Sequence, residues 1–264
     1  MTQLSVSVEH SSALASWLKV TDVALVREDL LPDGGGKKRR GLEKFAQDLR
    51  NVSDIHLLSY AGSHTAFSLS QMLPETIIHL YGTHYGGGAY ESSMVNILNQ
   101  QANVVQSIGS TLQMTRQFKR KKQQKQRNHH FMKIGGSLGT DPITREAARL
   151  VVAELDKDFH HFVAVASGDL LKNILEQTQN ATGVLTQPPA IRILKYLTLR
   201  NSRGMTRKSL GQRMRIMGEI CDLTGYQWDP IFMGSVFSYL KQMDRLPSKL
   251  CIWVTCPSGI DWIK

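Results

Sequence analysis

The chain has 264 residues, of which 41% are apolar, and this is enough to bury a substantial core as one large domain or two small ones. No window approaches about 18 unbroken apolar residues, and residues 1–20 contain no basic segment followed by a long apolar run, so we expect neither a membrane span nor a signal peptide. The formal net charge is +10, which would suit an anionic partner if the basic residues were gathered on one surface.

Short apolar runs alternate with longer amphipathic runs along the chain. The pattern predicts strands at 55–60, 76–81, 103–106 and 160–166, and helices at 66–72, 91–101 and 143–155. The last of these helices has Asp141 as its expected N-cap and Pro142 in its first turn. The alternation favours βαβ units, and therefore an α/β fold with mostly parallel sheets and helices on both faces.

A glycine triplet, Gly34 to Gly36, precedes the basic run Lys37 to Arg40. Glycine tolerates φ > 0, and its missing side chain leaves room for a flat ligand beside a lysine amine. A glycine turn before a basic, solvated helix start is the alternative interpretation.

The loop after the strand at 55–60 reads Ser63-His64-Thr65 and precedes a predicted helix. Three hydrogen-bonding side chains at a helix N-terminus suit a carboxylate, because they add their donors to free backbone N–H groups and to the helix dipole. The alternative is that Ser63 or Thr65 only caps the helix.

The basic character of the chain is local. Seven Lys and Arg residues and no acidic residue lie between Arg116 and Arg127, so the remainder of the chain has a net charge of only +3 (10 − 7). Phe118 is the only aromatic residue in this run, which therefore lacks the interleaved rings that stack on single-stranded bases. The composition favours a solvated helix or surface loop, and binding of phosphate or nucleic acid through Arg116 to Arg127 stays open as the less favoured alternative.

Metal-binding and disulfide chemistry have little support in the sequence. The pairs His129-His130 and His160-His161 lack the i, i+4 spacing of helical metal ligands, and we interpret them as surface and strand-edge residues. The three cysteines are an odd number without metal-ligand spacing, which indicates free thiols in a reducing compartment and predicts a cytoplasmic protein.

Several short segments, taken in order, resemble the D-cysteine desulfhydrase and 1-aminocyclopropane-1-carboxylate deaminase family. The similarity extends from about Val26 to Ser258. The segments are Arg27-Glu28-Asp29, Gly35 to Glu43, Ser63-His64-Thr65, Gly135-Gly136-Ser137, Ala166-Ser167-Gly168 and Asp229 to Gly234.

This resemblance implies a pyridoxal 5′-phosphate (PLP) enzyme of fold type II that acts on a small amino acid. By the family pattern, Lys38 is the Schiff-base lysine, although counting from Gly34 would choose Lys37 instead. The resemblance implies that Ser63, His64 and Thr65 hold the substrate carboxylate and flank the cofactor. It further implies that the cofactor is bound by Ser167, Gly168 and Thr255.

The resemblance also implies the organisation of the molecule. We expect a small subdomain at about 55–140, inserted in a larger one formed by 1–54 and 141–264, with the ligand between them. A homodimer is expected as well.

Three residues depart from the family pattern. Asp169 follows the phosphate-binding turn, where a like-charge pair at ~4 Å and an effective dielectric constant of ~20 would cost about 4 kcal/mol. Phe232 and Met233 stand where the family has a tyrosine and a residue that bonds the ring nitrogen. Two functions therefore stay open: a PLP-dependent lyase or deaminase, and a catalytically degenerate scaffold of the same fold that serves as a binding protein.

Overall fold

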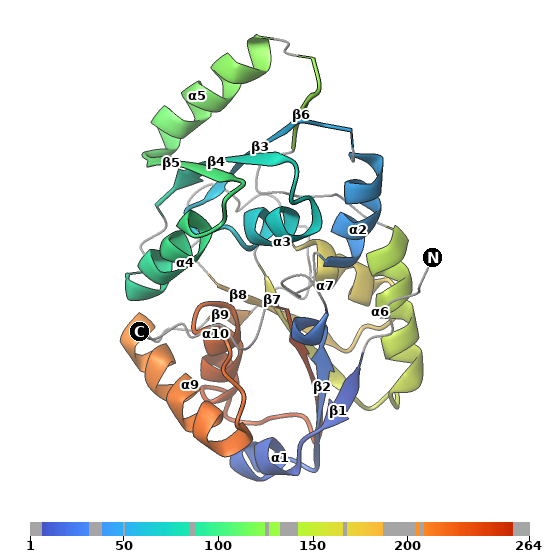
Figure 1. Cartoon of the computed structure of the whole chain (residues 1–264). Coiled ribbons are helices and arrows are strands. Elements are labelled where there is room, and N and C mark those ends of the chain that lie inside the picture. The colour runs from blue at the N-terminus through green and yellow to red at the C-terminus, as the bar shows by residue number, and fades with distance from the viewer. Residues whose placement is uncertain are drawn as a thin grey trace. The chain divides into compact units, whose positions relative to one another are not determined.

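The computed structural model describes residues 7–31, 39–49, 51–84, 88–124, 127–132, 142–165, 168–186, 204–205 and 209–255. The chain folds into two compact units. The first contains the described elements before residue 32 and those after residue 141, and the second contains the elements between them (Figure 1). No helix among the described residues is both long and apolar enough to span a bilayer.

The first unit is built on a six-stranded sheet with the order β1-β2-β10-β7-β8-β9. All its neighbouring strands pair in parallel except β1, which is antiparallel to β2. The strands are β1 (Val8–His10), β2 (Asp22–Arg27), β7 (His160–Val165), β8 (Ala181–Leu185), β9 (Gly204–Met205) and β10 (Lys249–Val254).

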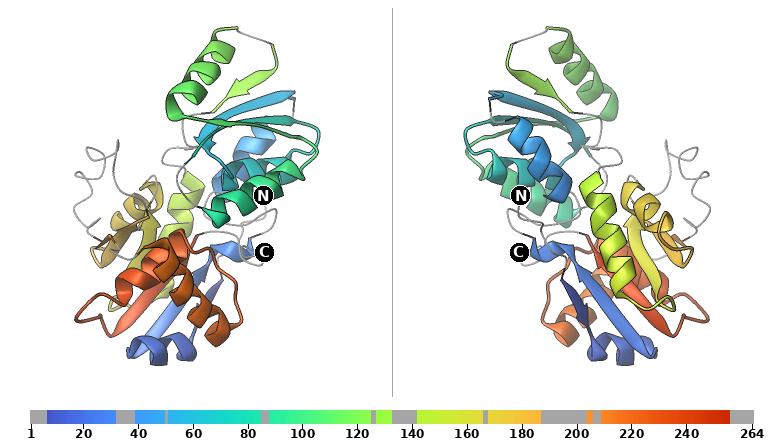
Figure 2. Two further views of the ribbon diagram at one scale, coloured as in Figure 1. Left: turned by 90° about the vertical axis from the view of Figure 1, so that its left-hand side faces the viewer. Right: turned by 90° about the vertical axis from the view of Figure 1, so that its right-hand side faces the viewer.

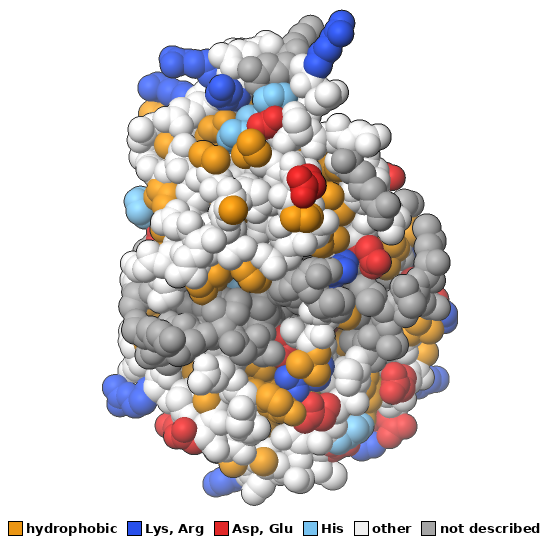
Figure 3. All heavy atoms as spheres, viewed as in Figure 1, with side chains coloured by type: hydrophobic (Ala, Val, Ile, Leu, Met, Phe, Trp, Pro, Cys, Tyr) orange, Lys and Arg blue, Asp and Glu red, His pale blue; other side chains and the backbone are white. Residues whose placement is uncertain are grey.

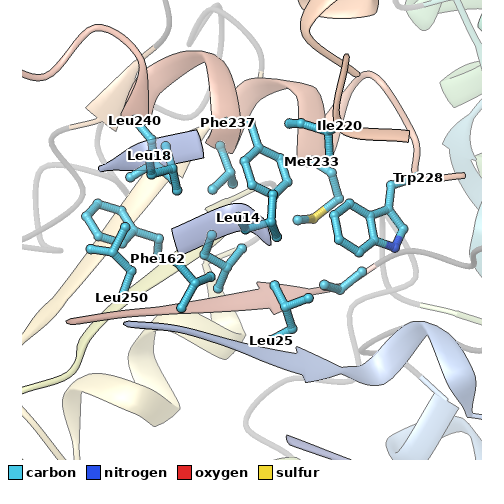
Figure 4. Close-up of a cluster of buried hydrophobic side chains, with 14 of the residues drawn as sticks. Leu14, Leu18, Leu25, Phe162, Ile220, Trp228, Met233, Phe237, Leu240 and Leu250 are labelled. Atoms are coloured by element: carbon cyan, nitrogen blue, oxygen red, sulfur yellow. The ribbon is translucent and has the colours of Figure 1, made fainter. Parts of the chain in front are cut away.

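Helices cover both faces of this sheet. The helical elements are α1 (Ser12–Leu18), η1 (Glu28–Leu30), α6 (Pro142–Glu154), α7 (Asp169–Leu175), α9 (Leu210–Thr224) and α10 (Phe232–Leu240). Successive residues of β10 point to opposite faces, so Leu250 and Ile252 pack with α1, α9 and α10 (Figure 4), whereas Cys251 and Trp253 pack with α6 and α7. Both faces are thus apolar, as expected for parallel strands buried on two sides.

The second unit has a four-stranded parallel sheet with the order β5-β4-β3-β6. Its strands are β3 (Asp54–Tyr60), β4 (Ile77–Thr83), β5 (Val104–Gly109) and β6 (His129–Phe131), and its helices are α2 (Arg39–Asp48), α3 (His64–Met72), α4 (Ala89–Asn99) and α5 (Thr111–Gln123). One face packs against α2, α3 and α4, and the other packs against Met114 and Phe118 of α5 (Figure 2).

The structure confirms the predicted α/β fold with mostly parallel sheets. The four predicted strands are β3, β4, β5 and β7, and the three predicted helices are α3, α4 and α6. The basic run lies mainly on α5, an exposed helix. We expected the residues of α2 in the larger subdomain, but Leu42 and Ala46 of this helix pack with Ile55 and Leu69 in the core of the second unit.

Both histidine pairs are more buried than the sequence suggested. His161 is only 2% exposed, because β7 lies between β10 and β8, and its Nδ1 lies 3.2 Å from Trp253 Nε1. The interpretation of His161 as a surface or strand-edge residue is therefore wrong. His129 does lie on the edge strand β6, but it is half-buried and joins a network with side chains of β3 and β4.

That network links polar side chains on the face of the second sheet that α5 packs against. His56 Nε2 lies 2.8 Å from His129 Nδ1, His56 Nδ1 lies 3.1 Å from Tyr81 Oη, and Asp54 Oδ1 lies 2.6 Å from His79 Nε2. The His56 and His79 rings stack with centroids 4.5 Å apart. Burial, followed by the nearby His79 and His129, lowers the pKa of His56 to about 4. In the described part of the chain, no group of three or more His, Cys, Asp or Glu side chains could hold a metal ion.

Candidate functional site

The carboxyl ends of β2, β7, β8 and β10 lie at one edge of the first sheet, because these strands are parallel. Ligands in open α/β sheets bind beyond this edge. The described residues that follow these strands are Glu28 after β2, Gly168 in the turn after β7, Thr186 after β8 and Thr255 after β10. Because β10 pairs with both β2 and β7, Thr255 follows the central strand of these three.

Thr255 has a buried hydroxyl group. The residue is 3% exposed, and its Oγ1 has no hydrogen-bond partner among the described residues. An unsatisfied buried polar group costs about 1–3 kcal/mol, so it calls for a specific explanation. Thr186 at the end of β8 differs, because its Oγ1 donates to the Val165 carbonyl at 3.3 Å. The Thr255 hydroxyl is therefore a candidate ligand contact.

Gly168 begins the helix that follows β7. Its φ of +84° lies in the left-handed region, which favours glycine, and its carbonyl accepts a hydrogen bond from Lys172 N at 3.0 Å. Asp169 is the first residue of α7 and is half-buried. The carboxylate of Asp169 thus follows directly on Gly168, the residue that the resemblance assigns to phosphate binding.

A buried ion network fixes the end of β2. Arg27 donates to Asp29 Oδ1 at 2.9 Å and Oδ2 at 2.8 Å, and to Glu9 Oε2 at 2.7 Å. Its guanidinium carbon lies 3.9 Å from the ring centroid of Tyr226, whose hydroxyl donates to Glu9 Oε1 at 2.9 Å. Burial alone would lower the pKa of Arg27, but the hydrogen bonds and the charge of Asp29 raise it overall. Glu28, which lies between Arg27 and Asp29 in the sequence, is also fully buried.

The Asp229-Pro230 segment has a structural role in this chain. Asp229 accepts a hydrogen bond from the backbone N–H of Phe232 at 2.6 Å and thereby stabilises the start of α10. Met233 is fully buried, and its side chain packs with those of Trp228 and Phe237 in the core (Figure 4). Met233 is therefore part of the hydrophobic core.

In the second unit, Ser63, His64 and Thr65 lie together at the start of α3, after the carboxyl end of β3. Gly62 in the preceding turn has a φ of +69°, and a Cβ at this position would overlap the Cβ of Met94. Ser63 and Thr65 are buried. Ser63 is the N-cap residue, yet its side chain makes no capping hydrogen bond. The hydroxyl of Ser63 is thus not used by the cap, which weakens the alternative based on capping.

A His–Glu pair follows the neighbouring strand β4. His84 Nδ1 lies 2.7 Å from Glu91 Oε1, and Glu91 is 7% exposed on the first turn of α4. In the sequence, His84 precedes the glycine run at 86–88. Nothing in the sequence pairs it with Glu91, because seven positions separate the two residues.

The predicted residues fall into three groups. Gly168 and Thr255 lie at the same edge of the first sheet, and Ser63, His64 and Thr65 lie together in the second unit. Lys37, Lys38, Ser167 and the Gly135-Gly136-Ser137 segment lie outside the described residues.

Comparison with known proteins gives structural but no sequence matches. No family model matches the chain, and no curated protein matches it. An ACC deaminase homologue superposes with a TM-score of 0.72 at 16% identity, over 96% of this chain and 89% of that one. For O-acetylserine-dependent cystathionine β-synthase from Helicobacter pylori the TM-score is 0.66 at 14% identity, over 97% of this chain and 93% of that one. A threonine deaminase from T.th. gives 0.65 at 16% identity, over 96% and 92%.

These neighbours share one architecture, so the chain has the fold of the fold-type II PLP-dependent enzymes. At such identities the likeness establishes the fold alone, and function has to be argued from the site.

Proposed function

We propose that the protein is a PLP-dependent lyase or deaminase acting on a small amino acid, of the D-cysteine desulfhydrase or aminocyclopropane-carboxylate deaminase type. The observation that supports this proposal most is the buried, unsatisfied hydroxyl of Thr255 at the carboxyl edge of the first sheet. A hydroxyl group can both donate and accept, so it suits a pyridine nitrogen in either protonation state. The Thr255 hydroxyl therefore suits a contact with the cofactor ring.

Three positions of the chain would hold PLP. Thr255 would hydrogen-bond the ring, and the Ser167-Gly168 turn would bind the phosphate, where glycine lets the backbone approach closely. Lys38 would hold the cofactor covalently through Nζ, with Lys37 as the alternative. When bound, PLP supplies an electron-withdrawing ring that stabilises negative charge at the substrate α-carbon.

The second unit would bind the substrate. The Ser63 hydroxyl and the backbone N–H groups in the first turn of α3 are donors that suit an amino-acid carboxylate. His64 and Thr65, next along the same turn, would orient the substrate and flank the cofactor. These residues discriminate for a carboxylate, and none of them specifies the rest of the substrate.

Asp169 favours a second candidate, a degenerate scaffold that binds cofactor weakly or not at all. The half-buried carboxylate would stand beside a dianionic phosphate, and each such like-charge pair at ~4 Å costs about 4 kcal/mol at an effective dielectric constant of ~20. This is enough to weaken binding several hundredfold. In that case the protein would act as a binding protein.

An absorbance titration with PLP distinguishes the two candidates. The enzyme hypothesis predicts a visible band of the purified protein that Lys38→Ala abolishes and Lys37→Ala preserves. Protein that stays colourless with added PLP, in both the wild type and Asp169→Asn, would exclude the enzyme. Colour that appears only in Asp169→Asn would instead identify the degenerate scaffold. A band that survives Lys38→Ala but not Lys37→Ala would identify Lys37 as the cofactor lysine.

Substrate class is tested separately on coloured protein. Release of ammonia or sulfide from D-cysteine and from 1-aminocyclopropane-1-carboxylate would be measured, with Ser63→Ala as the variant. We expect Ser63→Ala to raise KM by about tenfold, because it removes a carboxylate donor worth about 1.5 kcal/mol. Homodimer formation also stays a prediction, and light scattering of the purified chain measures it.

A further inference from the structure

The outward face of α5 is strongly basic. Met114 and Phe118 pack against Leu58 and Tyr81 of the sheet, and this contact uses the apolar side of the helix. Arg116, Lys119 and Arg120 lie on the opposite side of the helical wheel and are exposed. The helix contains no acidic residue. The face left in solvent is therefore made mainly of cations and amides.

These cations have no acidic partner among the residues that the structure describes. Some cations of the first unit pair with acids: Arg145 with Glu176 at 3.0 Å, Arg149 with Glu146 at 2.7 Å and Lys249 with Asp156 at 2.9 Å. By contrast, the basic residues of this region form no ion pair with any described residue, and Figure 3 shows Lys and Arg side chains gathered over α5. They are Arg116, Lys119, Arg120, Lys121, Lys122 and Arg127.

The same face of α5 borders an open hollow of about 320 Å³. It is lined by Ser110, Leu112, Gln113, Arg116, Gln117 and Arg120. Two guanidinium groups, two amides and one hydroxyl supply hydrogen-bond donors, and no described carboxylate lines the hollow. A planar guanidinium matches the geometry of a phosphate and binds it through two parallel hydrogen bonds.

The helix dipole accounts for only part of this pattern. Arg120, Lys121 and Lys122 lie in the last turn of α5, where positive charge is stabilised by the C-terminal end of the dipole. Arg116 lies a turn earlier, and the amides of Gln113 and Gln117 gain nothing from the dipole. A role in helix stability therefore does not explain the hollow.

We propose that the outer face of α5 binds the phosphate backbone of a nucleic-acid duplex without reading its bases. Three cations of this face, Arg116, Lys119 and Arg120, lie within five residues, which corresponds to about one per 2.5 Å at a rise of ~1.5 Å per residue. Duplex DNA has one negative charge per ~1.7 Å of its axis, so the two charge densities are complementary.

Other anionic partners fit this face less well. The only aromatic ring of the run, Phe118, is buried against the sheet and cannot stack on bases, which argues against recognition of single strands. An anionic membrane would be bound through an apolar helix side, but Met114 and Phe118 of α5 are buried and Leu112 is the large apolar side chain that this helix exposes. The surface lies wholly within the second unit, and the proposal does not depend on cofactor binding.

The test is the affinity for a fluorescein-labelled 20-base-pair duplex, followed by anisotropy between 50 and 200 mM KCl. We expect the wild-type affinity to fall steeply with salt. Arg116→Gln combined with Arg120→Gln should weaken binding at least tenfold at 100 mM KCl and reduce the log–log salt slope by about 2. Circular dichroism would check that α5 stays folded, which is expected because both side chains point to solvent.

A matched control removes the same charge elsewhere. Lys157 and Arg215 are exposed residues of the first unit, and Lys157→Gln with Arg215→Gln should leave the affinity within threefold of the wild type. Absence of wild-type binding at 50 mM KCl would overturn the proposal. So would an equal loss in both double variants, since net charge would then explain the affinity, or tighter binding to vesicles with 30% phosphatidylserine than to the duplex.

Discussion

At the scale of single residues, Thr255 is the position at which the proposed ligand contact can be tested most directly. Its hydroxyl is buried at the carboxyl end of a central strand and makes no hydrogen bond to any described residue. An unsatisfied buried hydroxyl group is costly, so this one calls for an explanation. The hydroxyl of Thr186, at the end of β8, is bonded and provides the comparison.

Thr255→Val should therefore separate stability from binding. Removing an unsatisfied hydroxyl should leave the free energy of unfolding without PLP unchanged or raise it by up to about 1 kcal/mol, while PLP affinity falls about five- to tenfold. Urea unfolding and the absorbance titration measure the two effects. Thr186→Val, which loses a formed hydrogen bond, should instead lower stability by about 1 kcal/mol. A stability loss in Thr255→Val as large as in Thr186→Val would contradict the assignment.

Gly62 is a second residue whose role is decided by its surroundings. Gly62→Ala should destabilise the protein by about 2–5 kcal/mol, because the new Cβ meets Met94 at a φ of +69°. Gly225→Ala is the control, since φ there is +73° but no atom lies within 4 Å of the added Cβ. The control should cost only about 1 kcal/mol in urea unfolding. Equal losses would show that the contact with Met94 relaxes freely.

At the scale of elements, the Arg27 network joins β1, β2 and the segment after α9. Arg27→Met would leave the Asp29 carboxylate buried without its partner, and we expect a loss of about 3–5 kcal/mol in the free energy of unfolding. Arg149→Met, which breaks an exposed pair on α6, should leave the unfolding midpoint unchanged. If both variants unfold at the wild-type midpoint, the network contributes no net stability.

At the scale of the whole molecule, two buried histidines make stability depend on pH. Burial lowers the pKa of His56 and of His161 to about 4, with nearby histidines adding to the effect in each case. The unfolded chain binds these protons near pH 6.5, whereas the folded chain does not until about pH 4. Between these values the unfolded state holds more protons, so stability falls as the pH is lowered.

The expected size of this dependence is about 2 kcal/mol for each histidine between pH 7 and pH 5. His56→Gln removes one of the two groups, and the difference in unfolding free energy between pH 7 and pH 5 should shrink by about that amount. Urea unfolding at both pH values measures it. The same pH dependence in the variant and the wild type would show that His56 does not titrate as proposed.

The amino-acid sequence was sufficient to predict the fold class and the local elements. Short apolar runs placed the strands β3, β4 and β7, and longer amphipathic runs placed the helices α3 and α6, because the spacing of apolar side chains along the chain is a local property. The glycine and hydroxyl residues of the candidate site were also visible, since their conformational and hydrogen-bonding properties belong to the residue types themselves.

The folded structure was needed to show which of those groups are buried and which have hydrogen-bond partners. Thr255 and Thr186 cannot be distinguished by the sequence around them. In the structure the Thr186 hydroxyl is hydrogen-bonded, whereas the Thr255 hydroxyl, after the central strand β10, has no described partner. The resemblance aligns Met233 with a residue that bonds the cofactor ring, whereas the packing of α10 places its side chain in the hydrophobic core. The burial of His161 and the contact of Glu91 with His84 also appear only in the folded structure. Burial and partnership depend on residues far apart in the chain, which is why a local pattern cannot supply them.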